Sequence, residues 1–501
     1  MLTPGDLTRF RALVARRLGL EFDDGKLGFL SEVLERRLSA LGLKLPAYED
    51  LLARDAAEVS ALAEQLTVGE TYFFRNIDQF HAFVDVALAA RTQAMSAFKS
   101  LRILSAGCSS GDEAYTLAML IHERLPERAS WDVRITGVDL NPRALEKARR
   151  ARYPAWSLRE TPQSARERWF RAEKSEFILD RQIAGAVTFR QGNLAEEDAL
   201  LWAPGTLDVV FCRNVSMYFP REVAARVMSR ISRALVPGGF LFLGHAENLR
   251  GLSQDFHLRH THGTFYYQRK TEEELARDEP HEGAALEFPQ TARPREATPT
   301  PLPPDTSWFE VIQHASQRIA DLTQRTPAPR IPPRATFDRT QALELLRTER
   351  FRDVVELVRA DRAIDTDPDA LLLLAVSLTN TGHLADAEAA CRRLLALDEL
   401  HAGAHYLLAL GHEHNGQLEA AQQADQVAVY LDPEFAMPRL HAGLVARRKG
   451  DLDAARRELT QALSLLDHED SSRILLFGGG FTRDALSALC RAELAACGAP
   501  R

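Results

Sequence analysis

Hydrophobic positions divide the chain into stretches with different periodicities. Over residues 1–90, leucines recur every three or four positions, which is the spacing of one face of an α-helix, so we expect this part to be all-helical. From about residue 100 to 270, short apolar runs alternate with helical patterns, and this alternation predicts an α/β fold with a largely parallel sheet. The leucine face is clearest at Leu27, Leu30, Leu34, Leu38 and Leu41. The runs that we expect to form strands are 101–106, 133–138, 186–190, 207–212, 239–244 and 264–268, the last of them as an edge strand.

The last part of the chain repeats itself every 34 residues. Four columns of residues share this period, led by Gly382, Gly416 and Gly450. A pair of helices that recurs every 34 residues is the signature of the tetratricopeptide repeat. We therefore expect an α-solenoid with an exposed concave face that binds a protein partner. The other columns are Ala387, Ala421 and Ala455; Leu384, Leu418 and Leu452; and Leu397, Leu431 and Leu465. The clear repeats are 367–400, 401–434 and 435–468, with a degenerate unit around 340–362 and a capping helix at 480–496.

A proline-rich segment separates these two parts. Of the 24 prolines in the chain, 11 lie within residues 271–335, which predicts an extended linker rather than a packed domain. Inside it, a few apolar residues fit one helical face. We expect there either a short helix that docks on a neighbouring domain or a helix that recognises a partner. The apolar residues are Trp308, Ile312, Ala315, Ile319 and Leu322.

Two glycines follow the first predicted strand and carry the most specific chemical signal. The strand leads into a turn with Gly107 and Gly111, and a helix follows; glycines in such a turn let the backbone approach a ligand closely. The chain shows neither the Gly-x-Gly-x-x-Gly spacing of a dinucleotide site nor the Gly-Lys-Ser/Thr of a phosphate loop. The second strand ends in Asp139, whose carboxylate can accept hydrogen bonds from both hydroxyls of a ribose. This combination favours S-adenosylmethionine (SAM) over NAD as the ligand.

Composition and charge narrow the function classes. The net charge of −8 and the pI of about 6.1 argue against bulk attraction to nucleic acid or to an anionic membrane. The sequence has no apolar run long enough for a membrane span and no signal-peptide pattern. Its five cysteines form no metal-binding cluster, so we expect no metal and a reducing, cytoplasmic location.

Four sequence blocks in the first 270 residues resemble one known family, the CheR-type chemotaxis receptor methyltransferases. These enzymes use SAM to methylate glutamate side chains. Two departures are visible, because Gly69 replaces a residue that is often polar in relatives and Ala114 replaces a common proline. The blocks are Gly69–Arg75, Gly107–Tyr115, Gly192–Leu194, and Phe211–Phe219 followed by Gly244–Asn248.

The resemblance also implies a domain plan. We expect an all-α N-terminal domain at 1–90 and a Rossmann-like methyltransferase domain at 91–270, with a small β-subdomain around 165–190. The linker at 271–335 then leads to the tetratricopeptide repeat domain at 336–501. The loop near Glu173–Glu176 is short, which resembles members that do not use a receptor tethering peptide.

A methyltransferase that acts on a carboxylate needs positioning more than acid–base chemistry. A glutamate is already ionised at neutral pH, so no general base is required, and holding donor and acceptor in line supplies much of the rate. We expect Arg75 to orient the acceptor carboxylate or bind the carboxylate of the donor, and Tyr218 to donate a hydrogen bond near the transferred methyl group. The alternatives are a surface ion pair for Arg75 and core packing for Tyr218. The predicted donor-binding residues are Gly69, Thr71, Arg75, Glu113 at the amino group, Asp139, Asn193, Leu194, Arg213 and Asn214. The resemblance implies that Asn193 and Leu194 contact the adenine.

The reading that we favour is O-methylation of glutamates on a chemoreceptor-like signalling protein, with the repeats recruiting an unknown partner. The resemblance implies the cytoplasmic helical bundle of the receptor as the substrate. It also implies a basic docking face on the N-terminal helices, for which Arg16, Arg17, Arg36 and Arg37 are candidates. The main alternative is a signalling adaptor that keeps ligand binding but acts mainly through its repeats. A small-molecule methyltransferase is disfavoured by the helical N-terminal domain.

Overall fold

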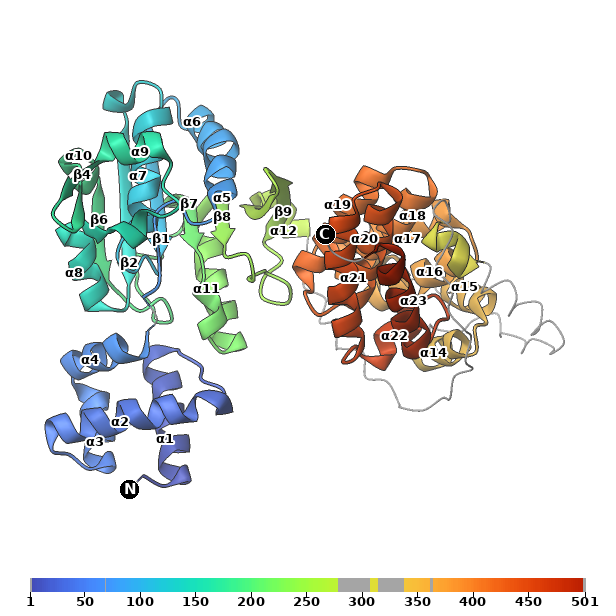
Figure 1. Ribbon diagram of the computed structural model, residues 1–501, viewed down its shortest axis with the longest axis horizontal. Helices are drawn as coiled ribbons and strands as arrows, with labels where there is room; N and C mark the ends of the chain where they lie inside the picture. The colour runs from blue at the N-terminus through green and yellow to red at the C-terminus, as the bar shows by residue number, and fades with distance from the viewer. Residues whose placement is uncertain (1, 68, 278–306, 314–337, 361–363, 499–501) are drawn as a thin grey trace. The chain divides into compact units, whose positions relative to one another are not determined.

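The computed structural model describes residues 2–67, 69–277, 307–313, 338–360 and 364–498 (Figure 1). The chain forms two compact units, Met1–Arg277 and Asp278–Arg501, and each is described by itself. None of the helices in the described ranges is long and apolar enough to cross a membrane.

Four helices form the N-terminal bundle of the first unit. Thr3 and Asp6 cap the start of the first helix reciprocally, and Gly19 ends it in the left-handed conformation with φ of 74°. Leu30 and Leu34 of the predicted leucine face are fully buried in the bundle core. The helices are α1 (Pro4–Leu18), α2 (Leu27–Leu41), α3 (Leu45–Arg54) and α4 (Ala56–Leu66).

The helices that follow pack with the sheet instead of the bundle. Phe80 and Phe83 belong to the same core as strand residues such as Phe211, so the bundle itself ends with α4. This end is earlier than the boundary at residue 90 that the helical pattern suggests, because the pattern shows that a helix has an apolar face but not which core that face joins. These segments are α5 (Ile77–Ala82), η2 (Phe83–Leu88) and α6 (Ala89–Ala94).

Seven strands form the main sheet in the order β6-β2-β1-β7-β8-β10-β9. The first five strands in this order run parallel to one another. Strand β10 runs antiparallel to both of its neighbours, β8 and β9. The strands are β1 (Ser100–Ala106), β2 (Asp132–Asp139), β6 (Val187–Gln191), β7 (Leu207–Cys212), β8 (Leu235–Leu243), β9 (Phe256–Thr261) and β10 (Thr264–Arg269). The connecting helices include α7 (Asp112–Arg124), α8 (Pro142–Arg150) and α11 (Arg221–Ala234), and α12 (Glu272–Arg277) ends the unit.

All six apolar runs form strands, but the expected edge strand is wrong. The run at 264–268 becomes β10, which lies between β8 and β9. The edge strand at this end of the sheet is β9, in which only Phe256 is fully buried. An edge strand pairs with a single neighbour and needs few apolar residues. The mostly polar sequence His257–Thr261 therefore did not predict a strand.

A second, three-stranded antiparallel sheet has the order β3-β5-β4. Strands β4 and β5 are joined by a two-residue turn at Lys174 and Ser175, so the loop is short, as the sequence indicates. The first strand lies outside the expected span 165–190. The elements are β3 (Arg152–Pro154), α9 (Gln163–Trp169), β4 (Phe170–Glu173), β5 (Glu176–Leu179) and α10 (Arg181–Ala184).

The second unit is a helical solenoid. Three pairs of helices coincide with the 34-residue repeats, and the glycine of each repeat lies in the turn within a pair at positive φ, a conformation that disfavours a side chain. The pairs are α16 (Pro368–Asn380) with α17 (Leu384–Leu397), α18 (Ala402–His414) with α19 (Leu418–Leu431), and α20 (Ala436–Arg448) with α21 (Leu452–Leu466). Flanking helices are α14 (Arg339–Arg347), α15 (Phe351–Arg359), α22 (Ser471–Phe477) and α23 (Arg483–Ala496).

The expectation of an exposed concave face is wrong. We call the face lined by the first helices of the pairs, α16, α18 and α20, the inner face. Helix α22 turns back onto α14 and α16, and its Phe477 packs on Tyr406 and Phe435. Residues 308–313 form a short helix whose Trp308 and Phe309 also lie against α18. Ala315, Ile319 and Leu322 fall outside the described residues.

Candidate functional site

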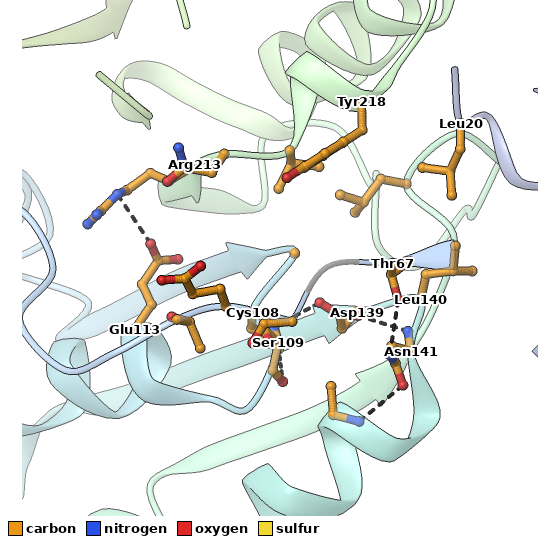
Figure 2. Close-up of a pocket in the computed structure, with 18 of the residues that line it drawn as sticks. Leu20, Thr67, Cys108, Ser109, Glu113, Asp139, Leu140, Asn141, Arg213 and Tyr218 are labelled. Atoms are coloured by element: carbon orange, nitrogen blue, oxygen red, sulfur yellow. Dashed lines mark hydrogen bonds and ion pairs between the residues drawn. The ribbon is translucent and has the colours of Figure 1, made fainter. Parts of the chain in front are cut away.

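One pocket lies at the carboxyl ends of strands β6, β2, β1 and β7 (Figure 2). The strand order reverses between β1 and β7, which is where open α/β sheets bind ligands. The pocket encloses about 1150 Å³ including its open mouth. Every predicted site residue lines it: Gly69, Thr71, Arg75, Glu113, Asp139, Asn193, Leu194, Arg213, Asn214 and Tyr218.

The glycine turn after β1 forms the floor of the pocket. Gly107 has φ of 76°, and a Cβ atom there would lie 2.3 Å from Cγ2 of Val215. Gly111 has φ of 85° and would place a Cβ atom 2.8 Å from the Phe189 ring. Both positions therefore exclude a side chain for two reasons, conformation and space. The two glycines that carried the sequence signal are required by the packing of this turn.

Asp139 lies at the end of β2 with both carboxylate oxygens held by backbone donors. The Ser109 N–H donates to Oδ2 and the Asn141 N–H donates to Oδ1, both at 2.8 Å (Figure 2). Burial raises the pKa of Asp139, and these backbone hydrogen bonds oppose the shift. Each oxygen keeps a lone pair for a further donor, so this rigid carboxylate can accept two hydrogen bonds from a ligand.

Glu113 and Arg213 form an ion pair on the opposite side of the pocket. The Glu113 Oε2 atom lies 3.5 Å from Arg213 Nε (Figure 2). The Ser105 hydroxyl donates to Glu113 Oε1 at 2.7 Å. Arg213 donates from Nη2 to the Arg75 carbonyl at 2.6 Å and to Asn76 Oδ1 at 3.0 Å. Its Nε and Nη1 atoms have no hydrogen-bond partner among the described residues.

Burial shifts the pKa values of this pair in opposite directions. It raises the pKa of Glu113 and lowers the pKa of Arg213, because the low-dielectric surroundings disfavour both charges, while their mutual attraction opposes each shift. Unused donor atoms on a buried guanidinium are costly to leave unpaired. The site is therefore prepared for an anionic oxygen next to Arg213 and a cation next to Glu113.

Arg75 ends an aromatic segment that anchors it at the pocket. Phe73 and Phe74 are buried, and their N–H groups donate to the Ser157 carbonyl at 3.0 Å and the Thr116 hydroxyl at 3.2 Å. Phe74 has φ of 59°, an uncommon conformation for a bulky residue. The half-buried Arg75 side chain makes one long hydrogen bond, 3.3 Å from Nη1 to the Glu70 carbonyl. Its guanidinium thus keeps most of its donors.

Tyr218 belongs to a loop that the carboxylate of Glu247 holds in place. The sequence did not predict a role for Glu247. Glu247 is 3% exposed and accepts hydrogen bonds from the N–H groups of Asn214 at 2.6 Å and Val215 at 2.9 Å. It also accepts from the Ser216 hydroxyl at 2.7 Å and the Gly244 N–H at 2.8 Å. Its only sequence signal is the block Gly244–Asn248. Glu247 therefore acts by holding the loop, not by touching the pocket.

The N-terminal bundle supplies the opposite wall. Leu20 and Phe22 line the pocket, and Tyr218 packs against the bundle core while its ring reaches into the pocket (Figure 2). The Glu21 N–H donates to the Tyr218 carbonyl at 2.8 Å, and Asn193 Nδ2 donates to the Arg17 carbonyl at 3.3 Å. Leu20, Phe22 and Leu194 form an apolar slot between the bundle and the sheet. Sequence patterns did not single out Leu20 or Phe22, because their function depends on how the two parts meet.

Comparison with known proteins assigns the family. Residues 69–265 match the family described as CheR methyltransferase, SAM binding domain, and residues 5–67 match CheR methyltransferase, all-alpha domain. The chain belongs to the CheR methyltransferase family. The site lies within the matched ranges, so the pocket is that of a SAM-binding methyltransferase domain. Among the described residues, no group of histidine, cysteine and carboxylate side chains is arranged to hold a metal ion.

Two relatives differ in how much of the chain they share. A probable biofilm formation methyltransferase WspC from Pseudomonas putida is 28% identical over 451 residues, which are 90% of this chain and 96% of that protein. Chemotaxis protein methyltransferase 2 from Vibrio cholerae is 32% identical over 274 residues, which are 54% of this chain and 94% of that protein. A solved structure of PcrH from Pseudomonas aeruginosa covers 26% of this chain and 92% of its own at 23% identity, with a TM-score of 0.23.

Proposed function

We propose that the chain transfers the methyl group of SAM to glutamate side chains of a chemoreceptor-like signalling protein and forms glutamate methyl esters. The observation that carries the proposal is the distribution of charge in the pocket. A fixed carboxylate, Asp139, faces a second carboxylate, Glu113, which lies beside a buried guanidinium with unused donors, Arg213. These groups match the functional groups of SAM.

The proposed donor site assigns one residue to each part of SAM. Asp139 accepts hydrogen bonds from the two ribose hydroxyls through its free lone pairs. Glu113 takes the ammonium group and Arg213 takes the carboxylate, which satisfies its Nε and Nη1 atoms. The apolar slot of Leu20, Phe22 and Leu194 covers the adenine ring. Gly69, Thr71, Asn193 and Asn214 complete the lining of the site.

Bound there, SAM supplies a methyl group on a positively charged sulfur. Arg75 orients the acceptor carboxylate, because its planar guanidinium matches a carboxylate and most of its donors are free. The Tyr218 hydroxyl donates a hydrogen bond near the transferred methyl group. The bond from glutamate oxygen to the methyl carbon forms as the bond to sulfur breaks, and the electron pair goes to sulfur. No proton moves, so the site needs no general base.

The substrate class rests on the relatives and on the N-terminal surface. The names of the two relatives mention biofilm formation and chemotaxis, which supports a signalling protein as the substrate. The predicted basic face is reduced, because Arg37 turns inward and donates from Nε to the buried Glu58 at 2.8 Å. We therefore propose that Arg16 and Arg36 contribute to receptor docking and that Arg37 supports the bundle.

The test is transfer of labelled methyl groups from SAM to the purified cytoplasmic domain of a chemoreceptor, followed by release of labelled methanol in base. Base-labile label identifies a carboxyl methyl ester. Label that resists base contradicts the proposed product. SAM binding without transfer to any receptor domain supports the adaptor alternative instead.

A further inference from the structure

Residues 307–313 occupy the inner face of the repeats through three apolar side chains. Trp308 lies between Phe481, with ring centroids 5.5 Å apart, and Tyr406, to whose hydroxyl its Nε1 donates at 3.4 Å. Phe309 meets the His414 ring at 4.7 Å. A Cβ atom on Gly479 would lie 2.4 Å from Ile312. All three side chains, Trp308, Phe309 and Ile312, are 1% exposed.

A buried carboxylate holds the start of this short helix. Glu413 of α18 accepts from the Ser307 hydroxyl at 3.1 Å and from the Trp308 N–H at 3.3 Å. A carboxylate at this position stabilises the free N–H groups and the positive end of a helix. The inner face is thus shaped to bind the first turn of a helix that carries aromatic residues.

The repeats balance the charge of Glu413 without residues 307–313. Arg448 donates to Glu413 at 2.7 Å, and His441 Nε2 lies 3.2 Å from it. The other nitrogen of His441 lies 2.7 Å from Asp425. This pairing with Asp425 and Glu413 outweighs burial and raises the pKa of His441 to about 10, so the ring carries a charge at neutral pH. Glu413 keeps two cationic partners when residues 307–313 leave, so no unpaired charge remains.

The short helix, in contrast, depends on the groove. Helices shorter than about 12 residues are marginal in water on their own, and residues 308–313 give only six helical residues in the described range. In the sequence it is flanked by the proline-bearing stretches 278–306 and 314–337. Because the segment and the groove belong to one chain, the segment competes with a partner as an intramolecular ligand.

We propose that the inner face of the repeats is a groove for an amphipathic helix of a partner protein, and that residues 307–313 occupy it in cis as a competitor. The partner helix begins with a hydroxyl residue, continues with two aromatic residues and places an aliphatic residue three positions further on. It docks with its N-terminus on Glu413. This is helix-in-groove recognition, in which spaced apolar anchors give affinity. The tethered segment lowers the apparent affinity of the groove for other helices, so only a partner that outcompetes residues 307–313 binds there.

The experiment uses the full chain and a fluorescent peptide with the sequence of residues 304–316. Binding is followed by fluorescence anisotropy. We expect the variant Trp308→Ala/Phe309→Ala/Ile312→Ala to bind this peptide at least about tenfold more tightly than the wild type, because its groove is empty. The matched control is Glu310→Gln, which changes an exposed residue of the same segment and keeps all three anchors; it binds like the wild type. A peptide with alanine in place of its tryptophan binds none of the proteins.

Equal binding by the wild type and the folded triple variant overturns the proposal, and so does the absence of binding to both. Thermal unfolding checks the fold of the variant. If the triple variant does not fold, Ile312→Ala takes its place with a smaller expected gain. Analytical ultracentrifugation tests whether a second copy of the chain fills the groove instead. A wild-type dimer that dissociates when the peptide is added would support that occupant and contradict a separate partner.

Discussion

The pocket of the first unit and the inner face of the second differ in what fills them. The pocket is lined by polar groups whose positions are fixed by backbone contacts, as Asp139 is fixed by Ser109 and Asn141, while donor and acceptor atoms remain available. On the inner face, Glu413 has its partners within the chain and Trp308 covers it. A catalytic site must keep hydrogen-bonding capacity free for its ligand, whereas a binding groove can be covered by its own chain until a stronger ligand arrives.

The strongest test of the pocket removes the residue proposed to orient the acceptor. Arg75→Ala should lower methyl transfer about 100- to 1,000-fold, the usual cost of losing an electrostatic contact in the transition state. The fold should persist, because Arg75 makes one long hydrogen bond. Initial rates with a receptor domain measure the effect. Arg134→Ala, an exposed arginine on β2 paired with Asp132, is the matched control and should keep wild-type rates. Normal turnover of Arg75→Ala would make Arg75 a surface residue.

The second test asks how much of the pocket depends on its buried support. Glu247→Ala leaves the N–H groups of Asn214, Val215 and Gly244 without their acceptor, which should cost about 2–4 kcal/mol of unfolding free energy. Denaturant unfolding measures this loss. Methyl transfer should fall as well, because Tyr218 is carried by the same loop. A variant with wild-type stability and altered activity would show that Glu247 acts in the pocket directly.

A third test concerns the ribose acceptor. Asp139→Ala should weaken SAM binding by roughly 1.5–3 kcal/mol, which is about ten- to a hundredfold in Kd. Titration calorimetry measures it on the full chain. The comparison variant Cys108→Ala changes a buried neighbour whose thiol has a pKa well above its usual value because of burial, and it should bind SAM nearly as the wild type does. Unchanged affinity in folded Asp139→Ala removes Asp139 from the site.

The last prediction is a pH dependence of donor binding. Burial raises the pKa of Glu113, and only its ionised form attracts an ammonium group. SAM affinity should therefore fall by about tenfold per pH unit as the pH drops below that raised pKa. Glu113→Gln should bind more weakly and lose this part of the dependence. Asp139, whose pKa burial also raises, accounts for what remains. Identical pH profiles of the two proteins would exclude Glu113 as the partner of the amino group.

The sequence predicted the parts of the molecule in which chemistry or backbone geometry restricts the residue type. Gly107 and Gly111 are required by conformation and space, and Asp139 follows them at a strand end, so the pocket could be located from the sequence. The residues missed are those that act through tertiary contacts. Leu20 joins the pocket only because the bundle packs on the sheet, and Glu247 reaches the loop of Tyr218 only because β8 pairs with β7.

The same reason explains the error in the repeats. The 34-residue period describes how each helix pair packs on the next, and it correctly locates the three pairs. It carries no information on segments outside the period. Trp308 and Phe477 reach the inner face from such segments, and an apolar residue there looks the same in sequence whether it meets the chain itself or a partner.

The difference between the pocket and the inner face predicts that the pocket is built from residues of the first unit alone. All its lining residues lie between Leu18 and Phe219, inside Met1–Arg277. The most direct measurement is calorimetric titration of SAM into the full chain and into the fragment of residues 1–277. Equal affinity, within about twofold, is the predicted result. A fragment that folds, as judged by circular dichroism and cooperative unfolding, but does not bind SAM would contradict the account, because the repeats would then contribute to the donor site.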